Sequence, residues 1–272
     1  MRIGICTSNI DEWPLAAALG YDFIEGSFGL LAGASEEEFA RMLRVKEACS
    51  IPVEAYNCFF PSSFVLYNRA QGDAREAEQA RIDEALCRHL QIGFSRAAAL
   101  GGRVAVIGSS RVRTIPEGMD RAEGMRQFSR VLTVCADWGA RYGIKVTVEP
   151  LSPIETDFIN TLSDGLDLVE AVSHPNLAAM VDFFHSRSQK EPLSSLLRAG
   201  ERLVHVHLCR ADRDLPRLGD AETDLLPCLL ALKQIGYGGR VSFEGNALPD
   251  FPTAARAALD EWKRLLNHPA LK

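Results

Sequence analysis

Short apolar runs alternate along this chain with longer segments whose apolar residues recur every three or four positions. Continuous runs rich in Val, Leu and Ile are typical of strands buried on both faces, and the longer spacing is typical of amphipathic helices. The predicted strands are residues 2–6, 21–25, 51–57, 103–107, 145–149, 177–182, 203–209 and 240–244. The predicted helices are residues 11–19, 35–49, 73–100, 121–142, 163–172, 193–198, 221–235 and 252–266.

The helix boundaries carry their own signals. Ser35 has the residue type of an N-cap, and Glu38 stands at the capping-box position three residues later. The helix over residues 73–100 stops at Gly101, and the helix over residues 121–142 stops at Gly143. Glycine commonly closes helices because it adopts the left-handed conformation without strain. These starts and stops support a regular succession of strand and helix.

Eight strand–helix pairs predict an α/β fold with a parallel sheet, because strands joined through helices run in the same direction. Their number and the length of 272 residues match a single closed (β/α)8 barrel over residues 1–272. A doubly wound open sheet is the alternative. Its dinucleotide-binding form places GxGxxG after the first strand, and residues 4–9 lack that motif.

Charge and composition limit the kinds of molecule that the protein can be expected to bind. A formal net charge of -6 gives no general attraction for phosphate backbones, so we expect a small soluble substrate and no nucleic acid. Seven scattered cysteines without CxxC favour a reducing cytoplasm. The chain opens without a signal-peptide pattern, and no apolar stretch approaches the roughly 20 residues that cross a bilayer. We expect a cytoplasmic protein without a membrane partner, and the sequence leaves assembly into a homo-oligomer open.

Four consecutive predicted strands carry, at or near their carboxyl ends, a side chain that can bind a metal: Glu149, Asp182, His207 and Glu244. The carboxyl ends of barrel strands meet at one mouth, where active sites are built. One acidic residue after a strand is usually a helix N-cap or a surface charge, but four in succession favour a shared cation. Three carboxylates and an imidazole suit Mn²⁺, Mg²⁺ or Co²⁺ better than a structural zinc.

The histidines near these strand ends have different expected roles, which depend on their positions. His205 and His207 share a strand at a spacing of two, so both point to the same side. We expect His207, nearer the mouth, to bind metal and His205 to be a hydrogen-bonded core residue. His185 lies three residues after Asp182, where it could reach substrate or orient a ligand. The alternative for His185 is an ordinary loop residue.

At these residues the chain resembles the xylose isomerase-like TIM-barrel superfamily, in particular the sugar phosphate isomerase/epimerase group with its tagatose 3-epimerase-like and hydroxypyruvate isomerase-like enzymes. The resemblance runs through most of the chain. It rests on Val-Glu-Pro-Leu at 148–151 followed by Glu155 and Asn160-Thr161, Val-Asp-Phe-Phe-His at 181–185, His-Val-His at 205–207 followed by Asp212-Arg213, and Phe-Glu-Gly at 243–245. Residues 20–25 and 108–110 also resemble segments of this group.

The resemblance implies one divalent metal, foremost Mn²⁺, with Mg²⁺, Co²⁺ or Zn²⁺ as alternatives, held by Glu149, Asp182, His207 and Glu244. It also implies that Glu149 and Glu244 act as acid and base on a hydroxy-ketone, through an enediolate that the cation stabilises. The substrate contacts that carry over are His185, Arg213 and Glu155. For Arg213 the alternative is a solvated loop charge.

The leading hypothesis is a metal-dependent isomerase or epimerase of a small ketose, hydroxy-ketone or sugar derivative. The alternatives are a metal-dependent lyase that dehydrates inosose or dehydroshikimate, a nuclease like endonuclease IV, and a barrel without catalysis. The sequence does not say which sugar is bound or whether it is phosphorylated. Arg111 and Arg113, in the predicted loop after the fourth strand, could bind phosphate or carboxylate, although arginines in a flexible loop are more often solvated.

Overall fold

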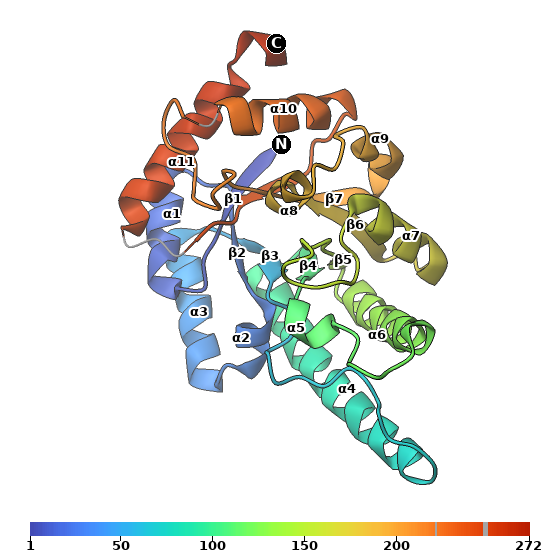
Figure 1. Cartoon of the computed structure of the whole chain (residues 1–272). Helices are drawn as coiled ribbons and strands as arrows, with labels where there is room; N and C mark the ends of the chain where they lie inside the picture. Colours follow the sequence, from blue (N-terminus) through green and yellow to red (C-terminus); the bar gives the residue numbers. More distant parts are fainter. Residues whose placement is uncertain (221, 247–249) are drawn as a thin grey trace.

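The computed structural model describes residues 1–220, 222–246 and 250–272. Parallel strands close into a barrel in the order β1 to β8, and helices surround it (Figure 1). The strands are β1 (Arg2–Cys6), β2 (Phe23–Ser27), β3 (Val53–Asn57), β4 (Val104–Ile107), β5 (Lys145–Val148), β6 (Leu177–Asp182), β7 (Leu203–Leu208) and β8 (Arg240–Phe243). The predicted α/β barrel is therefore confirmed.

The helices of the outer layer follow the strands in turn. The longer ones are α1 (Trp13–Leu19), α3 (Glu36–Cys49), α4 (Ala74–Leu100), α6 (Arg121–Arg141), α7 (Leu162–Val172), α10 (Glu222–Gln234) and α11 (Phe251–Leu266). The shorter ones are α2 (Phe28–Gly33), α5 (Ser110–Arg113), α8 (Phe183–Ser188) and α9 (Ser195–Ala199). Single 3-10 turns lie at Ile10–Glu12, Gly200–Arg202 and Pro269–Leu271.

The predicted elements are all found, and most boundaries fall within two residues of the prediction. The capping box at the start of α3 is present, with Ser35 accepting from the Glu38 amide and Glu38 accepting from the Ser35 amide. The predicted helix 221–235 begins at Ala221, which lies outside the described residues, and α10 starts at Glu222. Helices α2, α5 and α8 were not predicted, because each is too short to show a helical period.

The inside of the barrel is layered. Phe23, Ala55, Val104, Val106 and Met180 form a buried apolar cluster of their own. Strand side chains repeat their direction every second residue, so Glu25 follows Phe23, and Asp182 follows Met180, on the same face. An apolar layer therefore lies below a layer of charged groups, which are held near the carboxyl ends of the strands.

In the part of the chain that the structure describes, no helix combines the length and apolar character needed to span a membrane.

Candidate functional site

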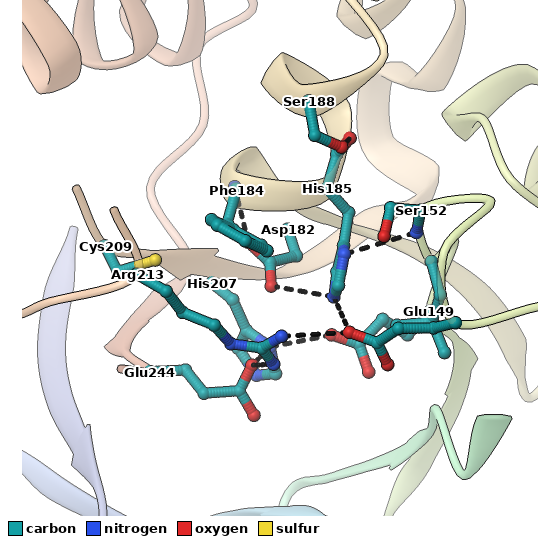
Figure 2. A network of polar contacts seen from close by, with 12 residues as sticks. Glu149, Ser152, Asp182, Phe184, His185, Ser188, His207, Cys209, Arg213 and Glu244 are labelled. Carbon is teal, nitrogen blue, oxygen red and sulfur yellow. Dashed lines mark hydrogen bonds and ion pairs between the residues drawn. The ribbon is translucent and has the colours of Figure 1, made fainter. Parts of the chain in front are cut away.

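The four predicted metal ligands meet at the mouth of the barrel. Glu149 follows β5, Asp182 ends β6, His207 lies on β7, and Glu244 follows β8. Each offers one ligand atom, and these atoms all lie within 4.8 Å of one another. Figure 2 shows these side chains turned toward a common point. The folding of four consecutive strands into adjacent barrel positions produces this convergence.

His207 lies at the centre of the group. Its Nδ1 is 3.1 Å from Glu149 Oε1 and 3.3 Å from Glu244 Oε2. Burial lowers the pKa of His207, but Glu25 and Glu244 outweigh burial and hold that pKa well above its ordinary value. Burial raises the pKa of Glu244, yet the charge and hydrogen bond of His207 bring it down to about 2. The site therefore favours positive charge at its centre.

Asp182 completes the group from the β6 side. Its Oδ1 accepts a hydrogen bond from the Phe184 amide at 2.7 Å, so this carboxylate also caps the start of α8. Burial is the main cause that raises the pKa of Asp182 to about 6; the Glu244 carboxylate adds to this rise, and His185 opposes it. Buried carboxylates this close repel one another, and a divalent cation relieves that repulsion. The donor set of three carboxylates and one imidazole therefore fits a hard divalent metal.

Glu25 of β2 is a buried residue that sequence reasoning missed. Its Oε2 contacts His205 Nε2 at 2.8 Å, and its Oε1 contacts His207 Nε2 at 2.9 Å. His205 is thus the hydrogen-bonded core histidine that we expected. Because Glu25 engages Nε2 of His207, the Nδ1 atom is left to face the carboxylate cluster. Glu25 closes a predicted strand, as Glu149, Asp182 and Glu244 do, and that signal could have identified it.

A second group of potential ligands, Cys6, Glu25 and His207, also lies within 4.8 Å. Burial raises the pKa of the Cys6 thiol well above its ordinary value, and nearby Glu25 raises it further. A thiol must lose its proton to bind a metal, so this environment disfavours metal at Cys6. The carboxylate-rich group is the better cation site.

The three predicted substrate contacts lie beside the cluster. His185 Nδ1 accepts from the Ser152 amide at 3.2 Å, and its Nε2 is 3.8 Å from Glu155 Oε1. Arg213 donates from Nη1 to Glu155 Oε1 at 2.9 Å, and its Nη2 is 3.9 Å from Glu244 Oε2. His185 is buried within α8, so it is not an ordinary loop residue. The paired and half-buried Arg213 is likewise not a solvated charge.

The two arginines after β4 have different environments, and the segment that carries them is the short helix α5 rather than the predicted loop. Arg113 is fully buried in α5, where its guanidinium donates to the carbonyl oxygens of Ile107, Glu149 and Ile159. The prediction that Arg113 could bind a substrate anion is also wrong, since its donors face the main chain. Arg111, in contrast, is exposed and lines the pocket above the candidate site.

A pocket of about 280 Å³ opens over the cluster. Five predicted residues line it, which are Glu149, Glu155, His185, Arg213 and Glu244. His185 Nε2 is buried without a hydrogen-bond partner among the described residues, so a ligand atom in this pocket would satisfy it. Asn57, at the end of β3, also lines the pocket, and its amide donates to Glu244 Oε1 at 2.8 Å.

Curated proteins with similar sequences include isomerases and epimerases. L-ribulose 3-epimerase of Methylomonas sp. (strain DH-1) is 34% identical over 147 residues, which cover 54% of this chain and 49% of that protein. The 2-oxo-tetronate isomerase of Haemophilus influenzae is 28% identical over 189 residues, covering 66% of this chain and 71% of that protein. The chain spans about half the length of the curated relatives it matches first.

The fold has close structural counterparts. D-psicose 3-epimerase with D-tagatose, from Clostridium cellulolyticum H10, superposes with a TM-score of 0.79 at 20% identity, covering 98% of this chain and 100% of that one. The sequence model that describes xylose isomerase-like TIM barrels matches residues 13–265. Since this match takes in nearly the whole barrel, the chain belongs to the xylose isomerase-like TIM barrel family.

Proposed function

We propose that the chain is a divalent-metal-dependent isomerase or epimerase of a small ketose, hydroxy-ketone or sugar derivative. The observation that carries the proposal is the convergence of one ligand atom each from Glu149, Asp182, His207 and Glu244 within 4.8 Å at the barrel mouth. We expect these four side chains to hold one cation, foremost Mn²⁺. When bound, such a cation polarises a carbonyl and a neighbouring hydroxyl and so acidifies the C–H between them.

Glu149 and Glu244 are the proposed acid and base. They follow β5 and β8, so their carboxylates enter the pocket from different sides of the barrel. One carboxylate removes the proton from the acidified carbon, and the other supplies a proton to complete the reaction. Asn57 holds Glu244 Oε1, which leaves Oε2 beside His207 and Arg213. Both carboxylates are therefore oriented before a substrate arrives.

Arg213, His185 and Glu155 are the proposed substrate contacts. Their polar atoms lie along one side of the pocket, with Arg213 and Glu155 joined by an ion pair. The Nε2 atom of His185, which makes no hydrogen bond to the described residues, is placed to bind a substrate oxygen. Together these groups would fix hydroxyls of a sugar in one orientation, which limits the carbon from which a proton is removed.

The relatives support proton transfer over dehydration, since the two curated proteins described above are named as an epimerase and an isomerase. The nuclease alternative is disfavoured because it needs further histidine ligands. The remaining described histidines are engaged elsewhere: His89 with the Phe59 carbonyl, His174 with Asp137 and His268 with the Ala270 amide.

The test combines metal content with proton exchange. The purified chain, loaded with Mn²⁺, is incubated with ketoses in D2O, and NMR follows deuterium uptake at carbon and the products formed. Glu149→Gln and Glu244→Gln should each lower exchange by about 10²- to 10⁴-fold. Glu54→Gln is the matched control, since Glu54 is a buried carboxylate of β3 that pairs with Arg2 and Arg240. Full exchange by both site variants would remove the acid–base roles, and loss of water from the substrate would favour the lyase.

A further inference from the structure

The two halves of the pocket differ in charge. In the closed barrel β4 lies opposite β8, so the segments after these strands face each other across the mouth. The proposed reacting and substrate-holding groups follow β5 to β8. The opposite wall is built by the segments after β3 and β4, with Phe60, Ser62, Ser109, Ser110 and Arg111 among its residues. Among the described residues of that wall, Arg111 is the one charged side chain.

Arg111 has no counterion among the described residues. Within the part of the chain that the structure describes, no carboxylate lies within 4.0 Å of its guanidinium, and no hydrogen bond engages it. The other arginine lining the pocket, Arg213, is paired with Glu155 at 2.9 Å. A guanidinium that faces a substrate pocket without a partner is available for an anion from solution.

The backbone that presents Arg111 is firmly held. Its neighbours Val112 and Arg113 are 7% and 0% exposed. Arg113 ties α5 to three main-chain carbonyls, and its own carbonyl accepts from the Tyr67 hydroxyl. Thr114 adds a contact of 2.8 Å between its hydroxyl and that of Thr156. One arginine of this short helix therefore anchors it, while the other is directed at the pocket.

We propose that the substrate carries an anionic group, a carboxylate or a phosphate, at the end distant from its reacting carbons, and that Arg111 binds this group. The inference rests on the proposed function for the position of those carbons beside Glu149 and Glu244. A guanidinium binds either anion through two parallel hydrogen bonds, and Ser62 and Ser110 line the same pocket. The pocket of about 280 Å³ limits the ligand to a small molecule.

Three probes with the same carbon skeleton show whether an anionic group is preferred and whether it is a phosphate or a carboxylate. They are D-fructose, its 6-phosphate and its 6-carboxylate. We expect the Mn²⁺-loaded wild type to exchange deuterium into one of the anions with a kcat/KM at least about 10-fold above that for D-fructose. Arg111→Gln should lower kcat/KM for that anion by about 10- to 100-fold and for D-fructose by less than about 2-fold. Arg111→Lys should recover part of the loss, since it restores charge without the planar fork.

Arg103→Gln is the control, because Arg103 is an exposed arginine before β4 at the opposite end of the barrel. It removes the same charge and should leave the preference for an anion unchanged. Equal efficiency on all three probes, or an equal loss on D-fructose and the anions in Arg111→Gln, would overturn the inference. If the wild type exchanges none of them, these hexoses are not substrates of the proposed reaction, and calorimetry with the same three probes tests the inference. Weaker binding of the anions to Arg111→Gln would then support it, and unchanged binding would refute it.

Discussion

Replacing Asp182 by Asn should stabilise the metal-free protein at neutral pH and reduce the stabilisation that added metal provides. Asp182 is 2% exposed, and burial raises its pKa from 3.8 to about 6. A carboxyl whose folded pKa lies above its unfolded value favours the folded state at low pH, and that contribution is lost as pH rises through the folded value. Each tenfold change in proton affinity corresponds to about 1.4 kcal/mol, so the ionised carboxylate costs the metal-free protein about 3 kcal/mol at pH 7.

Asn keeps the oxygen that caps α8 but carries no charge. In EDTA, Asp182→Asn should therefore match the wild type near pH 4 and become more stable than it by up to about 3 kcal/mol at pH 7. With Mn²⁺ at a hundred times the dissociation constant, the wild type should gain about 2.7 kcal/mol, and the variant, which lacks one ligand, should gain less. Urea denaturation at both pH values, with EDTA or with Mn²⁺, measures all these differences.

Asp120→Asn is the matched control, since Asp120 caps α6 away from the pocket. The difference in stability between this variant and the wild type should be the same at both pH values and with EDTA or Mn²⁺. A gap between wild type and Asp182→Asn that stays constant from pH 4 to pH 7 in EDTA would refute the assigned cost of the buried charge. An identical response of both proteins to Mn²⁺ would refute Asp182 as a ligand.

Three further substitutions test how the site is supported. Glu25→Ala leaves two buried histidines without their acceptor and should lower the free energy of unfolding by about 3–5 kcal/mol in urea; a loss below about 1 kcal/mol would contradict the network. Gly108→Ala places a methyl group 2.3 Å from Glu149 Oε2, so it should weaken Mn²⁺ binding in calorimetry, and unchanged affinity would show that this carboxylate can shift freely. Arg113→Met removes the donors to three carbonyls and should lower the melting temperature, while an unchanged value would show that water replaces them.

Much of the fold follows from local pattern. Buried strands read as continuous apolar runs, and long helices show their period and caps, so the succession that closes the barrel is visible in the sequence. The convergence of the four candidate ligands also follows, because adjacent strands in the chain are adjacent in the barrel. Short helices such as α5 and α8 could not be predicted from the sequence pattern, because tertiary contacts stabilise them and they are too short to show a period.

Contacts between residues far apart in the chain could not be predicted from the sequence either. Arg111 and Arg113 are two residues apart and chemically identical, yet one is exposed and the other fully buried. That difference arises from where carbonyls of β4 and β5 end in space, which no local pattern records. The bond from Glu25 to His207 spans 182 positions, so neither residue's surroundings in the sequence could reveal it.

This long-range bond affects what would happen if the barrel were split into two half-barrel fragments. All four candidate ligands come from the second half of the chain, on β5 to β8, so a half-barrel fragment would contain every one of them. It would still lack Glu25 of β2 and Asn57 of β3, which hold His207 and Glu244 from across the interior. Recombining this half with a foreign first half would therefore conserve the ligands and lose their alignment. The site is a property of the closed ring rather than of either module.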